Sequence, residues 1–226
     1  LTGGVAGSLA RLGHSVLCID MDIGLRNLDI SLGLSDRALM DFSDVAEGRC
    51  PLVRAAVNHP DLPGLALLTA PMTLSSALTE EAVRRMLDTA RSLYDYVLID
   101  SPAGLGAGFR MACCGADRAI VVSTNDASSL RDAQRTVGEL DFLRQIHLVM
   151  NRIQPKLLRQ LRTTIDDAMD TAGLPLLGVV PEDPQVMLSA NLGRPLILGG
   201  RQGAANACLN IAKRLEGRRV PIMRIR

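Results

Sequence analysis

The chain has 226 residues, enough for one large α/β domain and hardly enough for two. Hydrophobic residues make up 47% and the formal net charge is +1, so the chain can bury a core and has no bulk attraction for nucleic acid. We expect its five scattered cysteines to be small hydrophobic side chains in a reducing cytosol, not disulfides or metal ligands. No apolar run approaches the roughly 20 residues of a membrane span, and no signal peptide is visible. The sequence therefore predicts a cytosolic protein whose membrane contact, if any, is peripheral.

Apolar residues recur at strand and helical spacing in alternation along the chain. Strands are predicted at residues 16–19, 65–68, 96–99, 119–122, 146–150 and 176–180. Helices are predicted at residues 1–12, 39–47, 51–57, 79–90, 128–143, 157–172 and 204–215. The glycine-rich stretch 3–8 has no lysine and follows no strand, so we interpret it as small residues on a packed helix, not a phosphate loop. This alternation predicts a single domain over residues 1–226, with a mainly parallel sheet and helices on both faces.

Two of the predicted strands end in aspartate. Asp20 closes the first strand, Asp22 follows two residues later, and Asp100 closes the third strand. Ligands of open α/β sheets bind beyond the carboxyl ends of the strands. If the first strand continues, Asp20 and Asp22 face the same side; if it turns after Asp20, Asp22 lies on a loop. Asp100 suits a magnesium ligand and Asp22 suits the positioning of an attacking water, although an aspartate at a strand end also commonly caps the next element.

Polar residues follow two later strands at the same edge. Asn151 and Arg152 come directly after strand 146–150, and Pro181, Glu182 and Asp183 come after strand 176–180. An asparagine amide offers one donor and one acceptor, which can pair with the amino group and a ring nitrogen of adenine. Alone this is a weak signal, because asparagine is an ordinary loop residue.

Together these motifs resemble the MinD/ParA family of ATPases with the deviant Walker A motif, and within it the members that select the division site. The resemblance covers nearly the whole chain and is most specific in Gly-Leu-Arg-Asn-Leu-Asp (24–29) and Asp-Ser-Pro-Ala-Gly (100–104). Further matches are Glu-Gly-Arg (47–49), Ala-Leu-Thr (77–79), Ala-Asp (116–117), Arg-Asp-Ala (131–133), Asn-Arg (151–152), Gly-Val-Val-Pro-Glu-Asp (178–183) and Val-Pro (220–221). The implied fold is a P-loop NTPase of the SIMIBI class.

The resemblance also implies roles for single residues and partners. Asp22 would be the switch carboxylate near the attacking water, and Asp100 the Walker B aspartate that holds Mg²⁺, with Asp20 beside it. The residues that would hold the adenine of ATP are Asn151, Arg152, Pro181, Glu182 and Asp183. Asp132 would lie on the surface used by partner proteins. The implied assembly is an ATP-dependent homodimer on the inner face of the plasma membrane, with a MinC-like division inhibitor and a stimulatory partner linked to MinE or DivIVA; no nucleic acid is expected.

Two departures from the family pattern stand out. Family members begin with a strand and Lys-Gly-Gly-Val-Gly-Lys-Thr-Thr, and Leu1 aligns directly after that motif. We therefore expect the printed chain, an incomplete copy without the first strand and P-loop, to bind ATP poorly and not to hydrolyse it. Family members also end in a basic amphipathic helix, whereas only Arg224-Ile225-Arg226 follows Met223. Arg218, Arg219, Arg224 and Arg226 could touch anionic lipid, but a solvated basic end is the stronger interpretation.

Two alternatives remain open at this stage. The chain could be a related ATPase for flagellar number or for plasmid and chromosome partition; partition predicts a basic patch and salt-sensitive DNA binding. It could also be a non-catalytic binding module whose phosphate loop is truly absent. An iron–sulfur carrier is set aside, because such proteins need a Cys-x-x-Cys pair near the C-terminus and Cys208 stands alone.

Overall fold

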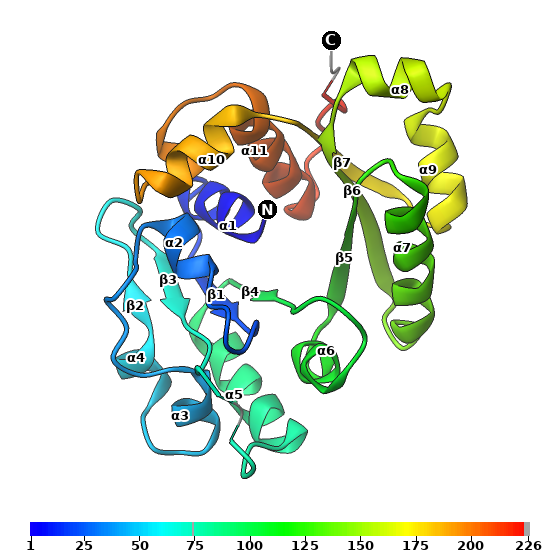
Figure 1. Ribbon diagram of the computed structural model, residues 1–226. Helices are drawn as coiled ribbons and strands as arrows, with labels where there is room; N and C mark the ends of the chain where they lie inside the picture. The colour runs from blue at the N-terminus through cyan, green and yellow to red at the C-terminus, as the bar shows by residue number, and fades with distance from the viewer. Residues whose placement is uncertain (74, 224–226) are drawn as a thin grey trace. The chain divides into compact units, whose positions relative to one another are not determined.

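The computed structural model describes residues 1–73 and 75–223, which form two compact units (Figure 1). The first unit comprises Leu1–Gly115 and Met187–Gly199, and the second comprises Ala116–Val186 and Gly200–Arg226. Each unit has its own sheet. The single domain predicted over residues 1–226 stays a prediction, because a division into two compact units does not test it. Arg224 and Arg226, named above as lipid contacts, lie outside the described residues.

The sheet of the first unit has four strands in the order β2-β3-β1-β4. The strands are β1 (Val16–Asp20), β2 (Val57–Asn58), β3 (Leu65–Leu68) and β4 (Tyr96–Asp100). β3, β1 and β4 are parallel, and only the short β2 pairs antiparallel. The helices of this unit are α1 (Thr2–Arg11), α2 (Leu28–Leu32), α3 (Phe42–Ala46), α4 (Leu52–Ala55), α5 (Glu80–Leu93), α6 (Ala107–Cys113) and the 3₁₀ turn η1 (Leu196–Leu198).

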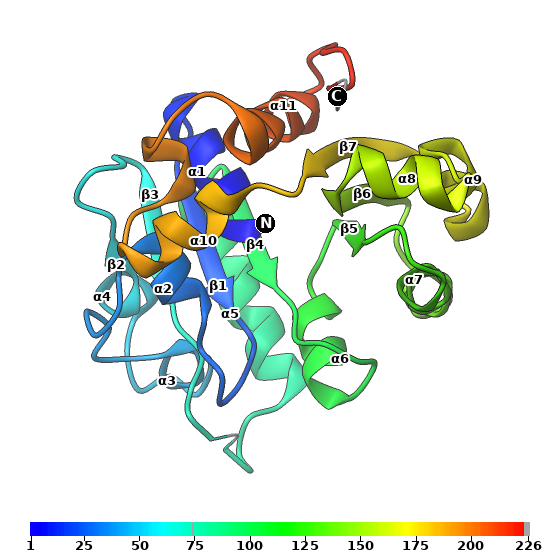
Figure 2. The ribbon, with the colours of Figure 1, turned by 45° about the horizontal axis from the view of Figure 1, so that its top comes forward.

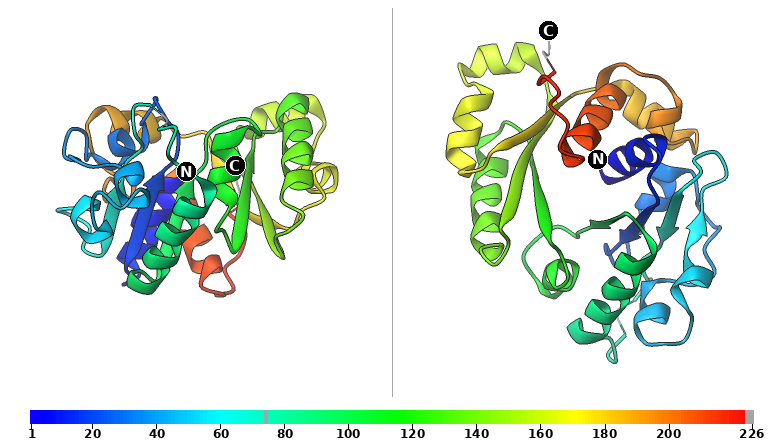
Figure 3. Two further views of the ribbon diagram at one scale, coloured as in Figure 1. Left: turned by 90° about the horizontal axis from the view of Figure 1, so that it is seen from below. Right: turned by 180° about the vertical axis from the view of Figure 1, so that it is seen from behind.

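Helices cover both faces of this sheet because β1 is apolar on both sides. Leu17 and Ile19 share one face, where they join a core cluster with Val83, Met86 and Leu87 of α5. α1 packs against β1, β3 and β4 outside that cluster, so it covers the opposite face (Figure 3). The glycine-rich stretch lies within α1, as predicted, and its glycines permit close packing against neighbouring side chains.

The end of α2 is tightly constrained. Gly33 has a φ of +65°, and a Cβ atom there would lie 2.1 Å from the carbonyl oxygen of Gly193. The buried imidazole of His59 contacts the Leu32 carbonyl through Nε2 at 2.9 Å, and its Nδ1 accepts from two backbone N–H groups, those of Asp61 and Leu62. These bonds assign the proton of the neutral ring to Nε2.

The second unit has three parallel strands in the order β5-β6-β7. The strands are β5 (Arg118–Ser123), β6 (Gln145–Ile153) and β7 (Leu176–Pro181). The helices are α7 (Ala127–Glu139), α8 (Pro155–Leu161), α9 (Ile165–Ala172) and α11 (Gly203–Leu215), while α10 (Pro184–Asn191) runs from this unit into the first. α7 and α9 cover one face and α11 the other (Figure 2). Gly178 permits this packing, because a Cβ atom there would lie 2.5 Å from Ile211 Cγ1.

The predicted fold class is confirmed, since both sheets are mainly parallel and carry helices on their faces. Two segments were predicted wrongly. The helix predicted at 157–172 is two helices, separated where Arg162 adopts φ 53° and Thr164 caps α9. The helix predicted at 51–57 ends at Ala55 and gives way to β2. Within the described residues, no helix is both long and apolar enough to cross a membrane.

Candidate functional site

The aspartates that end β1 and β4 lie side by side. Asp20 and Asp100 are register partners on neighbouring parallel strands, which lie ~4.8 Å apart. The Met21 N–H donates to the Asp100 carbonyl at 3.0 Å, so the two strands remain paired to their ends. Burial raises the pKa of the Asp20 carboxyl, and the charges of Asp100 and Asp22 raise it further, against backbone N–H bonds that lower it. Negative charge is therefore concentrated where Asp20 and Asp100 end their strands, and we call this part of the first unit the acidic edge.

Asp20 holds the loop that carries Asp22. Its side chain is buried, and Oδ1 accepts from the Asp22 N–H at 2.9 Å while Oδ2 accepts from the Leu28 N–H at 3.1 Å. β1 ends at Asp20, so the second of the two predicted alternatives is confirmed and Asp22 lies on a loop. Gly24, at φ +87°, donates from its N–H to the Pro71 carbonyl. The carboxylate of Asp20 thus fixes both ends of the loop.

Asp100 contacts the first turn of α1. The hydroxyl of Thr2 donates to Asp100 Oδ1, which brings the amino end of this helix to the acidic edge. Sequence reasoning did not find Thr2, since a helical pattern does not show which strand end its first turn faces. The turn after Asp100 is built of small residues, with Gly104 at φ +83°, and it leads into α6.

The ends of β6 and β7 bring together four of the five residues predicted for adenine. β6 extends to Ile153, beyond the predicted end at 150, so Asn151 and Arg152 lie within the last part of the strand. Ile153 pairs with Pro181, next to an irregularity in the ladder where Arg152 adopts φ 54°. Arg152 Nε lies 2.8 Å from Glu182 Oε2. These residues therefore form one polar edge in the second unit.

Asp183 has a structural task at the same edge. Its Oδ1 accepts from the Gln185 N–H at 2.9 Å, and its Oδ2 accepts from the Ala204 N–H at 2.8 Å in the first turn of α11. A Cβ atom on Gly203 would lie 2.1 Å from Asp183 Oδ2, so glycine makes room for this bond. Asp132 lies on the solvent-exposed side of α7, as its predicted role on a partner surface requires.

The donor set at the acidic edge resembles that of a magnesium site. Within the part of the chain that the structure describes, no group of three or more His, Cys, Asp or Glu side chains is arranged around one point. Mg²⁺ does not need such a group, because it is usually bound by one or two carboxylates together with waters and substrate phosphates. The adjacent carboxylates of Asp20 and Asp100 fit that requirement.

Parallel sheets with acidic residues at the carboxyl ends of their strands are typical of nucleotide-binding α/β proteins. Residues 1–196 match the CobQ/CobB/MinD/ParA nucleotide binding domain, and the chain belongs to this family. It is 37% identical over 227 aligned positions to the septum site-determining protein MinD of Synechocystis, covering 98% of this chain and 85% of that protein. The MinD of Bacillus subtilis is 38% identical over 221 positions, covering 95% and 82%.

Solved structures agree with these relatives. The MinC:MinD cell division protein complex of Aquifex aeolicus matches with a TM-score of 0.91 and 35% identity, covering 99% of this chain and 91% of that chain. The MinD of Pyrococcus horikoshii complexed with Mg-ADP matches with a TM-score of 0.83 and 25% identity, covering 95% and 88%.

Proposed function

We propose that this protein is an ATPase that positions the division septum, acting as an ATP-dependent dimer. The observation that carries the proposal is the pairing of Asp20 and Asp100 at adjacent strand ends, with Asp22 on the loop that follows. The similarity to MinD proteins over most of the chain supports the same conclusion.

Asp100 is the proposed magnesium ligand. It closes β4, and its Oδ1 is placed by the Thr2 hydroxyl. Asp20 is the proposed second carboxylate at the metal; both of its oxygens already accept a backbone N–H, so its first task is to hold the loop. A bound Mg²⁺ would neutralise charge on the phosphates of ATP. It would also offset the repulsion from Asp100 and Asp22, which adds to the effect of burial in raising the pKa of Asp20.

Asp22 is the proposed residue that orients the attacking water. Its backbone is fixed by Asp20, while its side chain is half-buried on the loop, where it can accept a hydrogen bond from water. Because this loop is anchored at both ends, the carboxylate of Asp22 can be held in one place without being part of a strand.

The polar edge of the second unit is the proposed adenine site. Asn151 supplies the amide donor and acceptor, and Arg152, Pro181 and Glu182 lie beside it at the ends of β6 and β7. Asp183 supports this edge by binding the first turn of α11.

The partners follow from the relatives. A solved complex of an Aquifex aeolicus relative contains MinC and MinD, so we propose a MinC-like division inhibitor as a partner, with Asp132 on the contact surface. The protein would act at the inner face of the plasma membrane, and a stimulatory partner would trigger hydrolysis.

The test uses the protein produced from its native gene and measures Mg-ATP binding, hydrolysis and ATP-dependent sedimentation with liposomes. We expect Asp22→Ala to bind ATP like the wild type but to hydrolyse it roughly 100-fold or more slowly, because water positioning contributes on that scale. Asp100→Asn should lose the magnesium dependence of ATP binding. Asp132→Asn is the matched control and should change neither measurement. Absence of both hydrolysis and ATP-dependent pelleting in the wild type would refute the proposal.

A further inference from the structure

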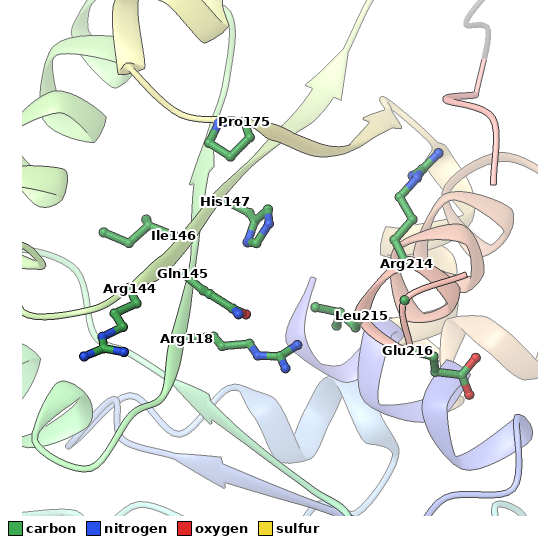
Figure 4. A pocket seen from close by; sticks show the side chains of 10 residues that line it. Arg118, Arg144, Gln145, Ile146, His147, Pro175, Arg214, Leu215 and Glu216 are labelled. Atoms are coloured by element: carbon green, nitrogen blue, oxygen red, sulfur yellow. The ribbon is translucent and has the colours of Figure 1, made fainter. Parts of the chain in front are cut away.

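The second unit contains a cavity of about 650 Å³ that none of the proposed roles uses (Figure 4). It lies at the amino ends of β5 and β6, opposite the edge that carries Asn151 and Pro181. Its walls include Arg118, Gln145 and His147 from the sheet, and Arg214, Leu215 and Glu216 from the end of α11.

The sheet wall presents hydrogen-bond donors to this cavity. Arg118 and Gln145 are register partners on β5 and β6, and His147 lies two residues further along β6, so all three share one face. In Figure 4 these side chains point toward α11, and Arg144, which also lines the cavity, points to the other side of β6. Within the described residues, Arg118 forms no ion pair, so its five N–H donors are available to a ligand.

The helix wall adds a fixed positive charge. Arg214 donates from Nη1 to the Leu177 carbonyl at 2.8 Å, from Nε to the Val220 carbonyl at 3.1 Å and from Nη2 to the carbonyls of Val220 and Pro221. These bonds hold the guanidinium in place, so Arg214 contributes charge to the cavity, and the N–H groups for a ligand come from Arg118. Glu216 is the carboxylate on this wall, and Arg218 Nε lies 2.7 Å from its Oε2. The acid is therefore neutralised by its own neighbour, and the positive charge of Arg118 and Arg214 remains.

We propose that this cavity binds a phosphate group. Arg118 presents a planar fork of N–H donors that fits phosphate oxygens, and the Gln145 amide and the His147 ring can add further donors beside it. The chain as a whole has a net charge of only +1, so this concentration of cations is local. A nucleic-acid backbone needs a stripe of cations along a surface, whereas Arg118 and Arg214 line a single hollow.

The phosphate could come from a soluble ester or from the headgroup of an anionic phospholipid. A second hollow, lined by Arg214, Arg218, Arg219, Val220 and Pro221, extends the basic surface toward the last described residues. The lipid source rests on the proposed membrane-associated function, whereas the soluble source does not.

The first arm of the test titrates the full chain with inorganic phosphate and with glycerol 3-phosphate and follows the three histidine rings by NMR. His147 is in the second unit, while His14 and His59 are in the first and serve as internal references. We expect a saturable shift of the His147 signals alone. Arg118→Gln should weaken binding roughly tenfold or more, because a charge-assisted fork is lost. Arg159→Gln removes the same charge from α8, which does not line the cavity, and binding should stay within about twofold.

The second arm compares sedimentation with vesicles of phosphatidylglycerol and of phosphatidylcholine. Loss of phosphatidylglycerol binding in Arg118→Gln, but not in Arg159→Gln, would support the proposal with a lipid source; an effect in the first arm alone would support a soluble source. If His147 does not respond to phosphate and vesicle binding is equal in both variants, the proposal is wrong. Failure of ATP hydrolysis would leave the first arm unaffected, so the two proposals fail separately.

Discussion

Replacing Asp20 tests whether one buried carboxylate holds the loop of Asp22. Asp20→Asn keeps one carbonyl oxygen and places an NH₂ group against the second backbone N–H, so one of the two bonds is lost. A hydrogen bond to a charged group contributes about 1.5–3 kcal/mol. Removing a carboxylate that lies beside Asp100 offsets part of that loss. We therefore expect the local opening of the loop to become easier by about 1–2 kcal/mol, a factor of roughly 5–30.

Hydrogen exchange measured by mass spectrometry reads this opening directly. The peptide that covers residues 21–28 should exchange faster in Asp20→Asn, and faster still in Asp20→Ala, which leaves both amides unpaired. The peptide that covers β6 in the second unit is the internal control and should not change. Wild-type exchange of residues 21–28 in Asp20→Asn would refute the inference that this carboxylate anchors the loop.

Three further predictions concern stability, measured by denaturant unfolding. Gly33→Ala should lower the free energy of unfolding by more than about 3 kcal/mol, because a positive φ and a clash with the Gly193 carbonyl add together. Gly48→Ala, at φ +77° in open space, should lower it by about 1 kcal/mol, and equal losses in the two variants would contradict this. His59→Ala should cost about 2–4 kcal/mol of the free energy of unfolding, because it leaves three backbone groups unpaired, those of Leu32 and Leu62 being buried. His59→Asn, which can still accept at the Nδ1 position, should cost less. Hydrogen bonds from neighbouring hydroxyl groups hold the pKa of Asp126 well below its usual range, so its contribution to stability is present above pH ~4 and lost on further acidification. Asp126→Asn should therefore lose less stability than the wild type between pH 5 and pH 3, and identical losses would rule this out.

Most strands of both sheets could be predicted from the sequence, because a strand that is buried on both faces of a sheet is a short continuous apolar run. The helix predicted at 157–172 was wrong because Leu157, Leu161, Ile165 and Ala168 continue one helical period through a break. A signal was present, since Thr164 and Asp167 form a capping box. β2 was missed because two residues are too short to show any alternation.

The acidic edge could be located from the sequence, but the tasks of its members could not be separated. Asp20 and Asp100 look alike at their strand ends, yet one accepts two backbone N–H bonds and the other accepts from a threonine hydroxyl. Asp183 likewise follows a strand end, which predicts a ligand-facing residue, but both of its oxygens accept hydrogen bonds from backbone amides. The positions of the donors that bond to a carboxylate depend on the tertiary fold, and some of these donors, such as the Thr2 hydroxyl and the Ala204 N–H, are distant in the sequence. A local sequence pattern therefore cannot predict them.

The burial of Cys18 and Cys208 gives each unit an internal reporter of its own opening. Cys18 lies in β1 and Cys208 in α11, both almost fully enclosed. Burial and the nearby charges of Asp100 and Asp20 raise the pKa of the Cys18 thiol, and burial raises that of Cys208 to about 11. Since only the thiolate attacks an alkylating reagent, each sulfur stays inert until its own surroundings come apart. Iodoacetamide modification, read cysteine by cysteine, would therefore show whether the two halves of the chain melt together or in turn.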